Sequence, residues 1–279
     1  MTVRGAVLII LAVLFAAWPA TTSAQTAAAP IIIGQSYRLP SAIMGEAREI
    51  NVWLPPGYGE TDQTYPVLVV LDGGVDQDFH HISGLAQLGT VNGTTRDVIV
   101  VGIASVDRRR ELALPSDDPD LIAAYPTQGH SQQFRDHLWR EVLPWIDANF
   151  STDGHRTLMG ESLGGLFVVE TFLKAPELFD AYVAVSPSLW WDGGRLARQS
   201  GAHLRDHSNE PRTLLLYLGN EGELMEAPMA VLLDALAEHA MPGLVWTYRP
   251  RPADTHATIY HGAALDAFRS LYSYPTEDE

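Results

Sequence analysis

The chain has 279 residues, 46% of them hydrophobic, and it contains seven tryptophans, so its composition excludes an intrinsically disordered protein. The formal net charge of -16 argues against nucleic acid or an anionic membrane surface as a partner. Cysteine is absent, which excludes disulfides and a lipid-modified cysteine.

The first 24 residues have the pattern of a secretory signal peptide. Arg4 supplies the charged end, residues 6–18 form an apolar core without charge, and residues 22–24 (Thr-Ser-Ala) form a small-residue cleavage site. The core is shorter than the roughly 20 apolar residues that span a bilayer, so we expect cleavage near Ala24 and no stable membrane anchor. The pattern predicts a periplasmic or secreted bacterial protein, with residues 25–279 as a single domain.

The elements expected in the first half of the mature chain are mostly strands. Alternating polar and apolar residues predict antiparallel edge strands at residues 35–39 and 48–54. Continuous apolar runs at residues 66–71 and 97–104 are typical of buried parallel strands. A helix is expected between these two strands, near residues 79–88.

Residues 156–174 place a Gly-x-Ser-x-Gly motif between a strand and a helix. Apolar residues precede the motif, and the apolar residues that follow it have helical spacing. The turn would hold Ser162 in a strained backbone conformation, which requires small residues two positions before and after it, and Gly160 and Gly164 meet this requirement. Gly165 would let the helix pack closely. At a helix N-terminus, the dipole favours a developing oxyanion. We therefore interpret Ser162 as a nucleophile rather than as a surface serine in a glycine-rich turn.

The other elements alternate between strand and helix. In chain order they are a helix at 131–149, a strand at 181–185, a helix at 195–207, a strand at 213–218, a helix at 228–239, a strand at 244–248 and a helix at 262–272. This alternation predicts an α/β protein with a mostly parallel sheet covered by helices on both faces.

The predicted architecture and the motif at Ser162 resemble the α/β-hydrolase fold. More narrowly, the chain is similar to the esterase family that includes esterase D and the enterochelin (siderophore trilactone) esterases. The similarity rests on Asn-Val-Trp-Leu-Pro-Pro-Gly-Tyr at 51–58, Leu-Asp-Gly at 71–73, Gly-Glu-Ser-Leu-Gly-Gly-Leu at 160–166, Pro-Glu-Leu-Phe at 176–179, Ser-Pro-Ser-Leu-Trp-Trp at 186–191, Gly-Asn-Glu-Gly at 219–222 and His-Ala-Thr at 256–258. This resemblance covers about the whole mature chain and implies a small-molecule ester as substrate.

In the α/β-hydrolase fold the catalytic residues follow in the order serine, acid, histidine, in loops at the carboxyl ends of strands. His256 lies in the loop after the last predicted strand, where the resemblance places the base. His261 is the alternative, although it would open the closing helix. His80 and His81 follow the Leu-Asp-Gly-Gly turn, where they would either line the pocket or begin a helix at its rim.

The acid is expected directly after the strand at residues 213–218. Glu221 and Glu223 both lie there, and Glu221 is favoured because the resembling sequences carry an acid in the same Gly-Asn-Glu-Gly setting. Glu223 would then be a solvated loop residue, and Asp254 is a less favoured substitute. The acid would fix the imidazole tautomer and stabilise the imidazolium.

Two backbone N–H groups should form an oxyanion hole. The first is expected from Leu163, the residue after the nucleophile, and the second from the loop at Asp72, through Gly74 or its neighbour Val75. Gly73 is small enough to let a substrate carbonyl approach closely. The alternative is that this loop is an ordinary turn.

Further residues are candidates for substrate contacts. Trp190 and Trp191 would wall the pocket, or one of them would pack beneath the loop. Residues 108–110 (Arg-Arg-Arg) could meet an anionic substrate such as a catecholate-iron complex. We favour instead salt bridges to the nearby Asp117, Asp118 and Asp120. The sequence has no metal-ligand spacing and no nucleotide-binding motif, and a serine triad needs no cofactor.

The residues together predict a serine carboxylic-ester hydrolase with an acyl-enzyme intermediate. Candidate substrates are siderophore lactones, acetylated or feruloylated carbohydrates, and small acyl thioesters. An acyltransferase on the same fold is the first alternative. A binding protein without activity is least favoured, since it has no need for serine, glutamate and histidine in this order.

Overall fold

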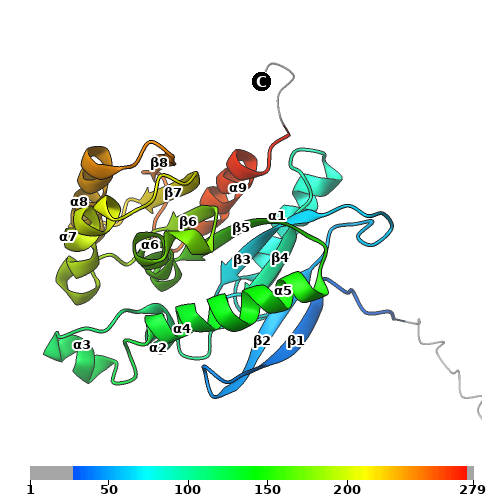
Figure 1. Ribbon diagram of the computed structural model, residues 1–279, viewed down its shortest axis with the longest axis horizontal. Helices are drawn as coiled ribbons and strands as arrows, with labels where there is room; N and C mark the ends of the chain where they lie inside the picture. The colour runs from blue at the N-terminus through cyan, green and yellow to red at the C-terminus, as the bar shows by residue number, and fades with distance from the viewer. Residues whose placement is uncertain (1–27, 275–279) are drawn as a thin grey trace, which may run out of the picture. The chain divides into compact units, whose positions relative to one another are not determined.

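One eight-stranded sheet organises residues 33–274 of the computed structural model, which describes residues 28–274 (Figure 1). The strand order is β1-β2-β4-β3-β5-β6-β7-β8. The predicted signal peptide at residues 1–24 lies outside the described residues. Among the described residues, no helix combines the length and the apolar character that a bilayer crossing requires.

The sheet is antiparallel at one end and parallel elsewhere, as the sequence predicts. β1 (Gln35–Ser41) pairs antiparallel with β2 (Glu46–Trp53), which pairs antiparallel with β4 (Ile99–Ile103). The remaining strands pair in parallel and are β3 (Tyr65–Leu71), β5 (Thr152–Glu161), β6 (Ala181–Val185), β7 (Arg212–Gly219) and β8 (Leu244–Arg251). The two predicted antiparallel strands and the predicted buried strands are therefore confirmed, but only β1 lies at an edge, because β2 pairs with β4 as well as with β1.

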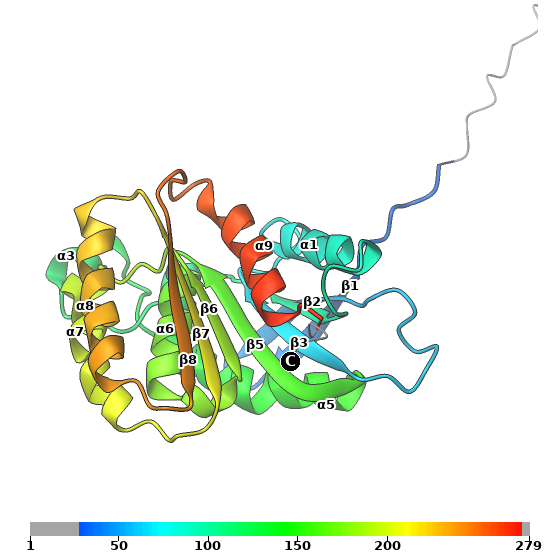
Figure 2. The same cartoon turned by 90° about the horizontal axis from the view of Figure 1, so that it is seen from above.

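Helices cover both faces of the sheet, which Figure 2 shows from above. One face carries α1 (Phe79–Val91) and α9 (Ile259–Leu271), and the other carries α4 (Ser131–His137), α5 (Leu143–Asn149), α6 (Leu163–Lys174), α7 (Trp191–Arg205) and α8 (Glu223–His239). β3 shows why two cores form, because alternate side chains point to opposite faces. Val67 and Val69 belong to the first core, while Leu68 and Val70 belong to the second.

Four helical segments differ from the sequence prediction. The helix expected at 131–149 is interrupted by a π-helical turn at Leu138–Val142. Two short helices, α2 (Arg108–Leu112) and α3 (Pro119–Ala124), are not predicted by periodicity because they span only one or two turns. Helix α8 begins at Glu223 rather than at Pro228. Because Pro228 has no N–H, the carbonyl of Leu224 lacks its helical hydrogen-bond donor. Leu224 is exposed, so water can supply that hydrogen bond.

The carboxyl ends of the parallel strands meet at one edge of the sheet, where open α/β folds place their ligands. The loop after β3 carries Asp72, and the turn after β5 carries Ser162. The loops after β6, β7 and β8 carry Ser186, Glu221 and His256. This edge therefore collects polar side chains from five separate strands.

Candidate active site

Ser162 occupies a sharp turn between β5 and α6. Its φ of 61° and ψ of -116° are strained values for a residue with a side chain. Backbone hydrogen bonds hold this conformation, because Ser162 N–H donates to Val185 O at 3.0 Å and Ser162 O accepts from Ser188 N–H at 3.0 Å. The chain from β6 thus fixes the turn on both sides of the serine.

The glycines of the motif are needed for different reasons. A Cβ on Gly160 would lie 2.6 Å from the carbonyl carbon of Gly164, and a Cβ on Gly165 would lie 2.8 Å from Val185 O. A Cβ on Gly164 would come no closer than 3.5 Å to a neighbour, which is ordinary contact. Gly164 therefore has room for a methyl group, so its own Cβ is not what requires a glycine there. Its backbone is the surface against which Gly160 packs.

Ser162, His256 and Glu221 form a continuous chain of contacts. The Nε2 atom of His256 lies 3.0 Å from Ser162 Oγ, and its Nδ1 atom lies 2.5 Å from Glu221 Oε2. The His256 side chain is 45% exposed, whereas the Glu221 side chain is 3% exposed. This order of hydroxyl, imidazole and buried carboxylate is the arrangement that activates a serine nucleophile.

Glu221 is fixed by two donors besides His256. Its Oε1 atom accepts from the Ser186 hydroxyl and, at 3.1 Å, from Gly219 N–H. Ser186 itself has a φ of 41°, so it is another strained residue beside the site. The role of Ser186 is not evident from the sequence, where its only signal is its place in the Ser-Pro-Ser segment after a predicted strand.

The alternative acids and the alternative base lie elsewhere. Glu223 is the first residue of α8, and Asp254 pairs with Arg251 at 2.6 Å. His261 lies in the first turn of α9, where its Nδ1 atom is 3.1 Å from Nε2 of His81. His80 is exposed. Within the described part of the chain, neither the three alternatives nor His80 hydrogen-bonds Ser162, although His261 lines the same pocket as Ser162.

Glu161 is a second carboxylate at the site, which the sequence reading did not single out. Its Oε1 atom lies 3.4 Å from Nε2 of His256. Burial raises the pKa of Glu161 to about 7, against the opposing attraction of His256 and Arg108, and the nearby Asp78 and Asp72 add to the rise. The signal that could have found it is its position inside Gly-x-Ser-x-Gly, directly before the nucleophile.

The two predicted oxyanion-hole donors have different surroundings. Leu163 N–H is the first of α6, which leaves it without an intrahelical acceptor. Gly74 N–H instead donates to Gln77 Oε1 at 2.9 Å, because the Gln77 side chain turns back over the loop. Across residues 28–274, Val75 N–H makes no hydrogen bond. In this arrangement the N–H of Gly74 is therefore already used, whereas the N–H of Val75 is free to donate.

Gly73 does not line a pocket beside Ser162, contrary to the prediction of a substrate contact. Its N–H donates to Ile103 O at 2.8 Å, and a Cβ at this position would lie 2.3 Å from Gly102 Cα. Gly73 is small because β3 and β4 approach each other closely here. The reason is packing rather than access for a substrate.

Two pockets flank Ser162 and His256. The first, of about 500 Å³, is polar and is also lined by Asp78, His81, Arg108, Glu161, Tyr260 and His261. The second, of about 440 Å³, is also lined by Ser188, Trp190, Asn220, Glu221, Met225 and Thr255. An ester bound at Ser162 would thus have space on both sides of its carbonyl carbon.

The adjacent tryptophans have separate roles. Trp190 lines the second pocket. Trp191 is only 1% exposed and donates its indole N–H to Leu114 O at 2.9 Å, so it packs beneath the loop. Of the two predicted substrate contacts, Trp191 is therefore wrong, because its side chain belongs to the core.

The arginines at residues 108–110 do not form the salt bridges that we favoured. Arg108 pairs with Asp72 at 2.9 Å, and the Arg109 guanidinium lies 4.6 Å from the centre of the Tyr125 ring. Asp117 pairs instead with Arg195, while the Asp118 side chain accepts from Asp120 N–H at the start of α3. Only Arg108 reaches the polar pocket, and its charge there is already partnered. Within residues 28–274, no group of three or more histidine, aspartate or glutamate side chains is placed to hold a metal ion.

Comparison with known proteins places these features in a family. The family model described as "Putative esterase" matches residues 41–240. Ferri-bacillibactin esterase BesA of Bacillus subtilis (strain 168) is 27% identical over 217 residues, which cover 71% of this chain and 74% of BesA. Three further curated relatives match over shorter stretches, which span 27%, 29% and 38% of their own lengths.

Solved structures share the whole architecture. An IroE-like serine hydrolase from Shewanella oneidensis has a TM-score of 0.77 and 28% sequence identity, and the match covers 86% of this chain and 80% of that chain. Siderophore hydrolase EstB from Aspergillus nidulans has a TM-score of 0.76 over 90% of this chain and 99% of that chain. At 20% identity, the likeness to EstB shows the fold alone.

Proposed function

The chain belongs to the family described as "Putative esterase" and is an esterase, and we propose that it hydrolyses carboxylic esters through a triad of Ser162, His256 and Glu221. The observation that carries this proposal is the unbroken path from Ser162 Oγ through both nitrogens of His256 to Glu221. No other histidine of residues 28–274 contacts Ser162.

The proposed reaction proceeds through an acyl-enzyme. Ser162 Oγ attacks the ester carbonyl carbon while His256 Nε2 takes the hydroxyl proton, and the carbonyl oxygen becomes an oxyanion. The carbon–oxygen bond to the alcohol then breaks, and His256 returns the proton to the departing alcohol. Water attacks the acyl-enzyme with His256 as base, which releases the carboxylic acid and restores Ser162.

Two groups assist these steps without changing covalently. Glu221 holds the proton of His256 on Nδ1, so that Nε2 faces Ser162 as an acceptor, and it stabilises the imidazolium that forms. Leu163 N–H and Val75 N–H are the donors that we assign to the oxyanion, since neither has an acceptor among the described residues. Each such donor is typically worth about a hundredfold or more in kcat.

The substrate class that we propose is a small acyl ester. Siderophore lactones are one candidate, because the relative BesA is named a ferri-bacillibactin esterase. The two pockets of about 500 and 440 Å³ are within the range of roughly 300–1,000 Å³ that suits small ligands.

The test is turnover of a panel of esters by the wild-type protein and by Ser162→Ala. The panel contains nitrophenyl esters of short and long acyl chains, a feruloyl ester and a ferric trilactone siderophore. We expect turnover of at least one ester and a loss on the order of a million-fold in the alanine variant, with folding retained. A serine-directed fluorophosphonate should add one label, at Ser162. Labelling elsewhere, or wild-type rates in Ser162→Ala, would contradict the proposal.

A further inference from the structure

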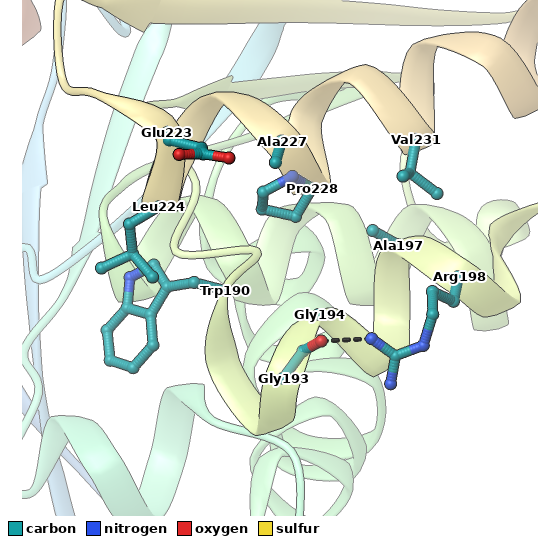
Figure 3. A pocket seen from close by; sticks show the side chains of 10 residues that line it. All are labelled: Trp190, Gly193, Gly194, Ala197, Arg198, Glu223, Leu224, Ala227, Pro228 and Val231. Atoms are coloured by element: carbon teal, nitrogen blue, oxygen red, sulfur yellow. Dashed lines mark hydrogen bonds between the residues drawn. The ribbon is translucent and has the colours of Figure 1, made fainter.

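A third pocket, of about 360 Å³, lies between α7 and α8 and does not include Ser162 (Figure 3). Glycines near the start of α7 leave this space unfilled. Asp192, Gly193 and Gly194 have φ values of 51°, 61° and 79°, so the helix is broken at its start, and a Cβ at Gly193 would meet nothing within 4 Å. Glycine is the residue that adopts such values at little cost, and here it also leaves the space unfilled. We call this pocket the α7–α8 groove.

Helix α8 presents a second apolar face to this groove. Met225, Met229, Leu232 and Leu236 point into the protein core. Another set, at the spacing i, i+3, i+4, i+7, lines the groove and comprises Leu224, Ala227, Pro228 and Val231. Leu224 is 67% exposed and Val231 is 41% exposed, so this face is not buried by the fold itself. An apolar face left open in this way marks a binding surface.

The groove adjoins the pocket of the proposed active site. Trp190 lines both the groove and the pocket that holds Ser162 and His256. In the first turn of α8, Leu224 faces the groove, while the next residue, Met225, lines the active-site pocket. Figure 3 shows Trp190 and Leu224 together at one end of the groove and Arg198 with Val231 at the other. The end of the groove nearest Ser162 is thus bordered by an indole and a leucine, with the Glu223 carboxylate beside them.

The wall at Trp190 is held in place. Trp191 is anchored in the core by its indole hydrogen bond, and Asp192 accepts from the Ser116 hydroxyl at 2.6 Å. Asp192 also pairs with Arg195 at 2.5 Å. At the far end, the Arg198 guanidinium donates to Gly193 O. A fixed wall of this kind is preformed for a ligand, which lowers the entropy cost of binding.

We infer that the α7–α8 groove binds an unbranched apolar chain of the ester, which runs from the carbonyl at Ser162 past Trp190. This inference rests on the proposed function, because the chain is part of the ester that Ser162 attacks. A methylene that becomes fully buried contributes about 0.8 kcal/mol, which is about fourfold in kcat/KM. The esterase should therefore prefer esters with long chains over their acetyl or ethyl counterparts.

The first test fills the groove. Ala227→Trp places an indole in it, and Ala230→Trp is the matched control, since Ala230 is an exposed alanine of the same helix that does not line the groove. We compare kcat/KM for nitrophenyl octanoate against acetate, and for octyl acetate against ethyl acetate. We expect the preference for the long chain to fall at least tenfold in Ala227→Trp in one of these two series, and the series affected identifies the chain as acyl or alkyl. Equal preferences in both tryptophan variants would overturn the inference.

A second pair of variants covers the case in which Ala227→Trp does not fold. Leu224→Asp puts a carboxylate at the end of the groove nearest Ser162, and Val245→Asp changes a similarly exposed residue, 64% against 67%, on β8. The long-chain preference should fall at least tenfold in Leu224→Asp and remain in Val245→Asp. The same fall in both variants would overturn the inference.

A binding measurement separates this inference from the proposed function. We expect calorimetry to detect 1-octanol binding to Ser162→Ala and at least tenfold weaker binding when Ala227→Trp is added. If octanol binds in this way but no ester is hydrolysed, the proposed function fails and the groove stands. If octanol binds equally to both proteins, the groove inference fails whatever the ester panel shows. If Ala227→Trp instead turns a dimer into a monomer in sedimentation without changing chain preference, the groove is an interface between copies and the inference is overturned.

Discussion

Glu161 Oε1 lies 3.4 Å from Nε2 of His256, the same nitrogen that contacts the Ser162 hydroxyl. His256, the proposed base, is therefore bordered by a second carboxylate at the nitrogen that does not contact Glu221. Because burial raises the pKa of Glu161 to about 7, this group changes charge within the pH range in which such an enzyme would work. Ionisation of Glu161 adds a negative charge close to Asp72 and Asp78, and repulsion from these two carboxylates opposes it.

Glu161→Gln should reduce the pH dependence of stability. A carboxyl whose pKa rises on folding binds its proton more tightly in the folded state, so its ionisation opposes folding. The folding stability that the protonated Glu161 contributes is fully present below the usual pKa of 4.5. It is lost as the pH rises toward 7, by on the order of 3 kcal/mol in total. We expect the stability of Glu161→Gln relative to wild type to increase by about this amount between pH 4 and pH 8. Urea unfolding at the two pH values measures the free energies of unfolding, with the exposed Glu223→Gln variant as control. A difference between Glu161→Gln and wild type that is the same at both pH values would contradict the prediction.

His256→Ala should be nearly as damaging as loss of the serine, because nucleophile and base act as a unit. His261→Ala serves as its control, since His261 contacts His81 rather than Ser162. We expect a fall in kcat on the order of a million-fold for the first variant and no more than about tenfold for the second. Steady-state kinetics with one good ester decide between them. High activity in His256→Ala would end the triad model.

Glu221→Gln keeps the size of the acid and removes its charge. The imidazolium then loses its partner, and we expect kcat to fall roughly a hundredfold or more. With an ester too short to reach the α7–α8 groove, which Glu223 lines, Glu223→Gln should have almost no effect, because Glu223 lies at the start of α8 and makes no contact with His256. If the two variants exchanged these results, the acid would be Glu223 and the arrangement after β7 would be wrong.

Ser186→Ala tests a positioning residue. It removes one of the two donors to Glu221 Oε1, and Gly219 N–H remains. A hydrogen bond to a charged group contributes about 1.5–3 kcal/mol, so we expect kcat to fall by about tenfold or more. KM should change little, because Ser186 lines neither pocket beside Ser162. Ser83→Ala is the control, since Ser83 is also buried but donates to Phe79 O in α1, at 2.7 Å. A rise in KM at constant kcat would argue for a substrate contact instead.

Gly160→Ala should disturb the turn that carries the nucleophile. The new Cβ would lie 2.6 Å from the Gly164 carbonyl carbon, so the backbone at Ser162 must move. We expect a loss of about 1–3 kcal/mol in the free energy of unfolding and a fall in kcat of at least a hundredfold. Gly84→Ala adds the same methyl in α1, where nothing lies within 4 Å, and should stabilise the protein by up to about 1 kcal/mol. Denaturant unfolding and one ester assay measure both effects.

The sheet is the part of the structure that the sequence predicts best. Buried parallel strands are continuous apolar runs, and β6 spans the five residues that the pattern indicates. Helix ends are less well predicted, because Pro228 has the properties of a first-turn residue and yet lies inside α8. The loops that carry Ser162, Glu221 and His256 follow from a rule of topology that ties each to the end of a strand, whereas the choice of Glu221 over Glu223 rests on the family resemblance.

Other features of the site depend on distances that a linear pattern does not contain. Glu161 and His256 are far apart in the chain and meet only because β5 and the loop after β8 end at the same edge. The contact between Gly74 and the Gln77 side chain depends on a rotamer. The sequence predicts an amphipathic helix at residues 228–239, but periodicity does not distinguish a face that packs from a face that stays open.

The three residues of the proposed triad are held by strands that differ in burial. Ser162 and Glu221 are fastened to β5, β6 and β7 in the middle of the sheet, whereas His256 follows β8, the outermost strand, most of whose residues are only partly buried. Edge segments open at a lower free-energy cost than central strands. On warming, the imidazole should therefore leave the site before the rest of the protein unfolds. Catalysis would then cease reversibly below the melting temperature, and amide hydrogen exchange in β8 would report that partial opening.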